Sequence, residues 1–180
     1  MSLTVTLRIA DETSKHIVEH FFLNFFVELS QYDPKMEINA HGLPVYGGFD
    51  GAEEVKTPEE CVRFNWWIRD RGEWIIIEVA GKPAGFAIVF DRQAPLPDGV
   101  DLELMDFYIA PKYRRKGVGQ RAAKQIFDRR RGRWILYELA ANIPALRFWH
   151  GFLEDYTGGN FENLEDGAQK RFDNRYVEEI

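Results

Sequence analysis

Two glycines directly follow a cluster of cations in the segment 114–120, which reads RRKGVGQ. Glycines at the start of a helix let backbone N–H groups come close to a ligand. The free donors of a first helical turn and the helix dipole then favour an anion at that point. Between residues 112 and 133, ten basic side chains stand against one acid, Asp128. This concentration of positive charge beside the glycines predicts a site for one polyanionic ligand.

Two other interpretations of the basic segment stay open at this point. The cations could form an ordinary solvated helix face, or they could bind RNA. An RNA-binding surface would need cations spread over a wide area with exposed aromatic side chains between them. Here the charge gathers beside two glycines, and the whole chain carries a net charge of −6. We therefore expect no nucleic-acid partner.

A strand must lead into this segment, and a helix must follow it. Residues 101–109 alternate between two faces, as a strand does. One face carries Leu102, Leu104, Asp106 and Tyr108, and the other carries Glu103, Met105, Phe107 and Ile109. Pro111 ends the strand because it cannot donate a backbone hydrogen bond. Beyond the glycines, Val118, Ala122 and Ile126 recur at the period of a helix.

The other periodic segments predict a mixed α and β chain. We expect strands at residues 3–9, 73–80, 84–91 and 133–139, and a last hairpin at 161–165 and 169–177. Helices are expected after Ser14 or Thr13, after the capping box at residues 57–60, and over residues 143–153.

Residues 31–56 show no sustained period, and a long stretch of this kind is often a binding loop. Over residues 31–60, seven acids stand against Lys35 and Lys56. These acids could attract a cationic amine, and an ordinary solvated loop is the alternative. In the helix that follows, we expect Cys61, Phe64 and Ile68 to be buried. Trp66 or Trp67 could line an acceptor pocket or pack at the core.

Length and composition limit the architecture and the location. A chain of 180 residues and 21.0 kDa is most simply one domain, residues 1–180. The single cysteine, Cys61, excludes an internal disulfide and fits a reducing compartment. The sequence shows no signal-peptide pattern and no apolar window of about 18 residues. We expect a cytoplasmic protein that neither binds membranes nor holds a metal.

The order of elements and two motifs resemble the GNAT superfamily, the acyl-CoA-dependent N-acetyltransferases. The family's Arg/Gln-x-x-Gly-x-Gly/Ala loop is matched by Arg114, Gly117 and Gly119, after a strand that ends FYIAPKYR. A looser match, NIPALRFW, begins at Asn142. The resemblance implies a mixed α+β fold. It predicts a mostly antiparallel sheet of six to seven strands with about four helices, and a coenzyme A loop at the start of the central helix.

The resemblance also implies acetyl-CoA as co-substrate. The loop amides would hold its pyrophosphate, the strand would contact the pantetheine arm and thioester, and the Asn142 segment would form the opposite wall. The residues carried over for coenzyme A are Phe107, Ile109, Arg114, Lys116, Gly117, Val118, Gly119, Gln120, Asn142 and Phe148.

Acyl transfer to an amine requires a base, a donor for the thioester oxyanion and an acid for the leaving thiolate. Glu103 is the candidate base, because strand alternation places it on the face of Phe107 and Ile109. Asp106 is expected on the opposite face. The position of the family's usual tyrosine acid is Trp149, whose indole is not a useful proton source.

Tyr156 or Tyr137 could supply the missing acid, and solvent is the alternative. Two functions therefore remain. The chain could be an N-acetyltransferase for a primary amine of a small molecule or peptide. It could also be a coenzyme A-binding sensor or interaction module without efficient turnover. The sequence leaves open whether the protein is a homodimer.

Overall fold

The computed structural model describes residues 3–65 and 71–177. Its sheet strands are β1 (Val5–Ile9), β4 (Gly72–Val79), β5 (Lys82–Asp91), β6 (Leu102–Ile109), β7 (Arg133–Tyr137), β8 (Phe161–Leu164) and β9 (Gln169–Asp173). The α-helices are α1 (Lys15–Leu29), α2 (Pro58–Asn65), α3 (Val118–Arg129) and α4 (Ile143–Thr157). A separate hairpin pairs β2 (Met36–Ile38) with β3 (Pro44–Tyr46).

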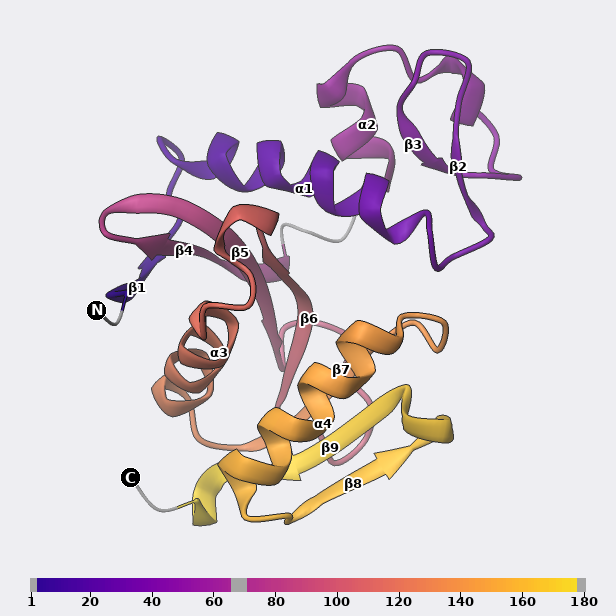
Figure 1. Ribbon diagram of the computed structural model, residues 1–180. Coiled ribbons are helices and arrows are strands. Elements are labelled where there is room, and N and C mark those ends of the chain that lie inside the picture. Colours follow the sequence, from indigo (N-terminus) through magenta and orange to yellow (C-terminus); the bar gives the residue numbers. More distant parts are fainter. Residues whose placement is uncertain (1–2, 66–70, 178–180) are drawn as a thin grey trace.

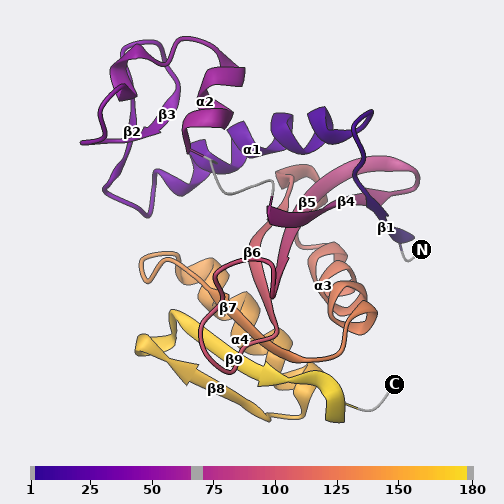
Figure 2. The ribbon, with the colours of Figure 1, turned by 180° about the vertical axis from the view of Figure 1, so that it is seen from behind.

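The seven sheet strands follow the order β1-β4-β5-β6-β7-β9-β8. Every pairing in this sheet is antiparallel except that of β6 with β7. The predicted mixed fold, with its mostly antiparallel sheet and about four helices, is confirmed. Figure 1 shows α3 and α4 in front of the sheet, and Figure 2 shows the strands β7, β8 and β9 from behind.

Two hydrophobic cores lie on opposite faces of the sheet. On one face, residues of α3 and α4 such as Ile126 and Leu153 pack with Leu104 of β6. On the other face, the phenylalanines of α1 pack with Ile76 and Phe86. Strand alternation produces this arrangement, because successive side chains of a strand point to opposite faces.

The predicted β4–β5 hairpin is present, but its turn is shorter than the expected residues 81–83, because Lys82 and Pro83 already pair with β4. Val79 pairs with Lys82, so the turn consists of Ala80 and Gly81. Both residues have positive φ values, 51° and 73°, as a two-residue hairpin turn of this kind requires. The predicted last hairpin is also present as β8 and β9.

The acidic segment before α2 is more ordered than its sequence predicts. Its hairpin is held by the buried Asn39, whose amide donates to the carbonyls of Ala52 (3.0 Å) and Val55 (2.8 Å). Strands of three residues are too short to produce a period, so the sequence showed only a loop.

Cys61 is buried as expected. Ile68, Trp66 and Trp67 lie outside the described residues.

The capping signals of α2 and α4 act as their sequences predict. Thr57 Oγ1 accepts from the Glu60 amide (3.2 Å), while Glu60 Oε2 accepts from the Thr57 amide (3.1 Å). Asn142 caps α4 by accepting from the Ala145 amide (3.2 Å). The helix α4 then continues four residues beyond the predicted end and stops at Gly158, which has φ 62°.

Candidate active site

The glycine loop connects β6 to α3 through the short 3₁₀ turn Pro111–Tyr113. Gly117 precedes α3 with φ 70°, a left-handed conformation that favours glycine. The first helical hydrogen bond runs from the Arg121 amide to the Gly117 carbonyl. The amides of Val118, Gly119 and Gln120 therefore have no acceptor within the helix. These free amides are compatible with the predicted anion site, which stays a prediction.

Gly119 allows a close approach between α3 and α4. A Cβ atom at this position would lie 3.2 Å from the ring of Phe148 and 3.8 Å from Ile109. The three residues thus bring the glycine loop, the end of β6 and the second turn of α4 together. The family resemblance assigned all three residues to coenzyme A, and that assignment stays a prediction.

The side chain of Arg114 does not face the loop. Its Nη2 atom pairs with Glu28 of α1 (2.6 Å), its Nε atom donates to the Ile109 carbonyl (2.6 Å), and its guanidinium lies over the Tyr108 ring. The expectation of a guanidinium beside the pyrophosphate is therefore wrong for this conformation. The reason is that Glu28 of α1 and the Tyr108 ring hold the guanidinium on the side of α1.

Two other cations fold back onto the loop itself. Lys116 Nζ donates to the Lys112 carbonyl (2.7 Å), and Arg121 Nη2 donates to the Lys116 carbonyl (2.8 Å). The Nε atom of Arg121 is buried and has no hydrogen-bond partner among the described residues. Sequence reasoning missed Arg121, although its place one turn into the helix could have indicated it.

The strands β6 and β7 separate beyond a short paired region. Their parallel register covers Leu102 to Leu104 against Trp134 to Leu136. Beyond it β6 continues to Ile109, while β7 ends at Tyr137. Phe107 lies in the separated part, where its ring stacks on Phe148 with centroids 6.0 Å apart and meets Trp149 at 5.1 Å. An extended ligand could pair with the edge of β6 here.

A β-bulge in β6 changes which side chains share a face. Asp106 pairs with Ile88 and Leu104 pairs with Val89, so Met105 has no partner of its own on β5. The extra residue reverses the alternation beyond it. Leu104, Phe107 and Ile109 consequently belong to the core under α3 and α4, whereas Tyr108 belongs to the core under α1.

The bulge corrects the predicted positions of the two acids on β6. Glu103 pairs with Phe90 and Asp106 with Ile88, and both partners lie in the core under α1. Glu103 therefore does not share a face with Phe107 and Ile109. It shares the opposite face with Asp106. Because the bulge depends on pairing with β5, the β6 sequence alone could not reveal it.

Burial and nearby carboxylates shift the pKa values of several groups on this face. Burial raises the pKa of Glu103, and the Glu103 charge contributes to the raised pKa of Tyr137. Burial and the charges of Asp33 and Asp106 raise the pKa of Tyr46. The structure thus adds Tyr46 and Asp106 to the candidate site. Tyr46 lies in a segment without a sequence period, which is why it was missed.

Tyr156 is not placed to act as the acid. Its hydroxyl donates to Asp128 (3.0 Å) near the C-terminal end of α3, while the glycine loop lies at the other end of that helix. Burial raises the pKa of Tyr156 to about 12, and its ring packs on Phe127 and Phe152. The assignment of Tyr156 is contradicted, because α4 continues past its predicted end and carries the residue into the core.

Trp149, at the position where the family often has tyrosine, is 6% exposed and packs among aromatic rings. Its neighbours Phe107 and Phe148 belong to the separated strands and the α4 wall. A cavity of about 590 Å³ lies elsewhere, between β1 and the C-terminal half of α3. This cavity is remote from the glycine loop, so we do not include it in the candidate active site.

Residues 3–65 and 71–177 show neither a metal-binding cluster nor a membrane-spanning helix. They contain no group of three or more histidine, cysteine, aspartate or glutamate side chains arranged for a metal ion. None of their helices is long and apolar enough to cross a membrane.

Comparisons with known proteins agree with this geometry. The chain resembles an acetyltransferase from Thermus thermophilus (16% identity, TM-score 0.56, covering 94% of this chain and 96% of the other). It also resembles a GNAT-family acetyltransferase from Staphylococcus aureus (10% identity, TM-score 0.54, covering 94% and 99%). At these identities the likeness concerns the fold alone.

A third similar structure is diaminobutyrate acetyltransferase from Paenibacillus lautus, solved with L-2,4-diaminobutyric acid and coenzyme A (13% identity, TM-score 0.50, covering 87% and 78%). No curated protein matches the sequence. The family model described as "Acetyltransferase (GNAT) family" matches residues 43–152, which include β6, the glycine loop and most of α4. The chain belongs to the GNAT family of acetyltransferases.

Proposed function

We propose that this protein transfers an acetyl group from acetyl-CoA to a primary amine of a small, cationic molecule or peptide. One observation carries the proposal. The bulge at Met105 places Glu103 and Asp106 on one face of β6, while Phe107 and Ile109 face the glycine loop side. A single strand thus separates a donor side from an acidic acceptor side at the point where β6 and β7 part.

Donor binding rests on the backbone of the loop. The first-turn amides of α3 would hold the pyrophosphate, with Lys116, Gly117, Val118, Gly119 and Gln120 around it. Phe107, Ile109 and Phe148 would contact the pantetheine arm. Asn142 would act indirectly, because its side chain already caps α4.

Glu103 would accept the proton of the attacking amine, directly or through water. Its raised pKa suits a base, because a carboxylate that ionises closer to neutral pH accepts a proton more readily. The amine nitrogen forms the new amide bond as the bond between the carbonyl carbon and sulfur breaks. The leaving thiolate takes a proton from solvent or from Tyr137, because Tyr156 is held in the core.

The acceptor side favours a cation. Burial raises the pKa of the Tyr46 hydroxyl, and the charges of Asp33 and Asp106 add to the shift, which supports a negative potential on this surface. An ammonium group would be stabilised there. An amine with a second positive charge fits best, since one nitrogen must lose its proton to react and the other can stay charged.

The alternative is a coenzyme A-binding sensor without efficient turnover. Trp149 favours it, because an indole replaces the usual acid and lies in the aromatic core. Under this alternative the loop would bind coenzyme A, but Glu103 would have no role in turnover.

Acetyl-CoA consumption, measured as free thiol over a panel of diamines, polyamines, amino acids and N-terminal peptides, separates the two functions. We expect turnover with a dicationic amine and a loss of about 10²-fold or more in kcat for Glu103→Gln. Glu78→Gln is the matched control, since Glu78 is also a strand glutamate but pairs with Arg8 away from the site. Tight coenzyme A binding with no amine-dependent thiol release would leave the sensor as the function.

A further inference from the structure

A second cationic site lies at the end of β6 that is remote from the glycine loop. Asp101 precedes β6 and Gly132 precedes β7, and the two residues adjoin a cavity of about 520 Å³. We call this cavity the arginine pocket. Its lining residues are Asp91, Arg92, Gln93, Asp101, Leu102, Arg130, Arg131, Gly132 and Arg175.

The charge of the arginine pocket opposes that of the chain. Four arginines line it against two aspartates, whereas the whole sequence carries a net charge of −6. Arginines that served only to neutralise these aspartates would not need to exceed them in number. The excess creates a local positive potential, which attracts anions.

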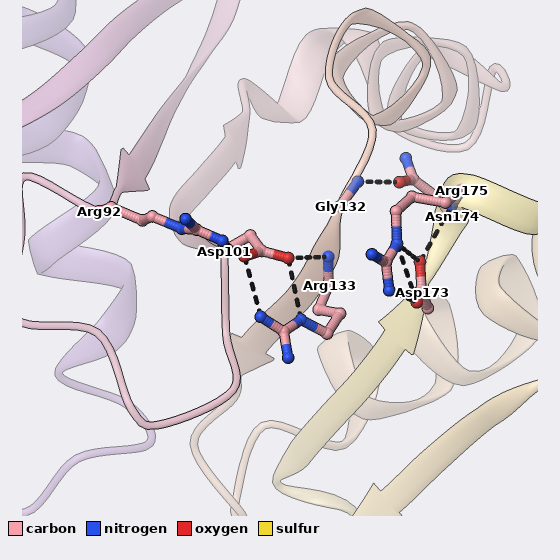
Figure 3. Close-up of polar contacts among 7 residues, drawn as sticks. All are labelled: Arg92, Asp101, Gly132, Arg133, Asp173, Asn174 and Arg175. Carbon is pink, nitrogen blue, oxygen red and sulfur yellow. Dashed lines mark hydrogen bonds and ion pairs between the residues drawn. The ribbon is translucent and has the colours of Figure 1, made fainter.

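The guanidinium groups are held in fixed positions by carboxylates. Asp101 lies between Arg92 and Arg133 and accepts from both (Figure 3). Arg133 binds it through Nε (3.0 Å) and Nη2 (3.1 Å). These hydrogen bonds lower the pKa of Asp101 well below its usual range. Asp173 holds Arg175 in the same way.

The turn beneath the pocket is fixed by a buried amide. Asn174 is 0% exposed, and its Oδ1 atom accepts from the Gly132 amide (2.8 Å). Its Nδ2 atom donates to the carbonyls of Phe127 (2.8 Å) and Arg130 (3.0 Å). Asn174 thus fixes residues 127–132, which carry Arg130, at both Phe127 and Gly132. A site built this way needs little reorganisation when a ligand binds.

Hydrogen-bond donors remain unused on three of these side chains. Each guanidinium has five N–H donors. Within the described part of the chain, Arg92 donates only through Nη2 to Asp101, and Arg130 only through Nη2 to Asp91. Arg175 uses Nε and Nη2 on Asp173, which leaves Nη1. These unused donors suit phosphate oxygens, which arginine recognises with two parallel hydrogen bonds.

We propose that the arginine pocket binds a phosphate group of a small molecule, separately from the glycine loop. The cavity volume is within the range of small-molecule sites. The unused donors of Arg92, Arg130 and Arg175 suit the several oxygens of a phosphate better than the two of a carboxylate. This inference does not rest on the acetyl-transfer reaction, because no residue of the pocket belongs to the candidate active site.

Calorimetric titration with pyrophosphate, with and without excess coenzyme A, tests the proposal. We expect two sites on the free protein and one when coenzyme A occupies the loop. The double variant Arg92→Gln/Arg175→Gln should weaken the remaining site by about tenfold or more. Arg129→Gln is the matched control, because Arg129 is adjacent in sequence to the lining residue Arg130 but pairs with Glu73 and does not line the pocket.

A second variant, Arg92→Lys/Arg175→Lys, keeps the charge but removes the paired donors. It should fold like the wild type and bind pyrophosphate more tightly than the Gln variant but less tightly than the wild type. Pyrophosphate binding that is unchanged in the Gln variant would overturn the proposal. A different result would count against the proposed donor site: pyrophosphate binds the free protein at the arginine pocket, but coenzyme A displaces none of the bound pyrophosphate.

Discussion

The two ends of β6 carry similar charge but hold it in different ways. At the glycine loop, the donors are backbone amides of α3, and the nearby cations Arg114, Lys116 and Arg121 bond mainly to backbone carbonyls. At the arginine pocket, the donors are side chains fixed by Asp101 and Asp173. The comparison teaches that a high density of cations does not identify the binding atoms. At the loop the cations shape the backbone, and at the pocket they are themselves the donors.

The largest effect should come from changing the loop backbone. Gly117→Val would force a branched residue into a positive φ and place its Cβ about 3.0 Å from Arg121 Nη1. Strain of about 1–3 kcal/mol should disorder the amides, so we expect coenzyme A affinity to fall by roughly 100-fold in calorimetry. Gly42→Val is the control, since Gly42 has φ 77° with open space around it. An equal loss of coenzyme A affinity in both variants would show that the backbone conformation at Gly117 is not what binds the ligand.

At the pocket end, the largest effect should be on stability. Asn174→Ala would leave the Gly132 amide without its partner in a buried place and would remove the side-chain bonds to the carbonyls of Phe127 and Arg130. We expect the free energy of unfolding in urea to fall by about 2–4 kcal/mol, while coenzyme A affinity stays unchanged under native conditions. Asn163→Ala, on the exposed strand β8, should change the unfolding free energy by less than about 0.5 kcal/mol. A simultaneous loss of coenzyme A binding would mean that the two ends of β6 are coupled.

Lys170 is a cation that, unlike those at the two ends of β6, is almost fully buried. Its Nζ atom binds Glu138 Oε1 (2.7 Å), and the two side chains are 1% and 2% exposed. Burial raises the pKa of Glu138 from 4.5 to about 7, although Lys170 opposes the shift. A carboxyl group whose pKa is higher in the folded state stabilises the fold fully below the unfolded pKa. That contribution is lost as the pH rises through the folded pKa.

We therefore expect the unfolding free energy to fall by about 1–3 kcal/mol between pH 4.5 and 7 on account of Glu138. Glu138→Gln should remove this part of the pH dependence in urea titrations at several pH values. Glu162→Gln, an exposed glutamate on β8, should leave it in place. A pH profile that is the same in wild type and Glu138→Gln would contradict the raised pKa.

The smallest effect should come from Arg114. Its ion pair with Glu28 is partly exposed, so Arg114→Gln should cost about 1 kcal/mol or less of unfolding free energy. Because its guanidinium faces α1, coenzyme A affinity should change by less than about twofold. A tenfold loss of affinity would show that Arg114 turns toward the pyrophosphate when the donor binds. Arg8→Gln, which removes another surface pair, is the control.

The sequence determined those features that depend on neighbouring residues. The glycine loop before α3, the existence of the β4–β5 hairpin, and the capping box at Thr57 could all be read from it. Each depends on backbone freedom or on hydrogen bonds within a few residues, so local sequence is enough to specify them. The most specific part of the resemblance to the acetyltransferases, the glycine loop, is one such local motif.

Only the tertiary structure decided the features that depend on partners remote in sequence. The bulge at Met105 arises from pairing with β5, and it moved Glu103 to the face of Asp106. Glu28 turned Arg114 away from the loop, and the length of α4 carried Tyr156 into the core. The arginine pocket joins Arg92, Arg130 and Arg175 from three separate segments. No local pattern could reveal these arrangements, because each depends on which distant segment the folded sheet brings alongside.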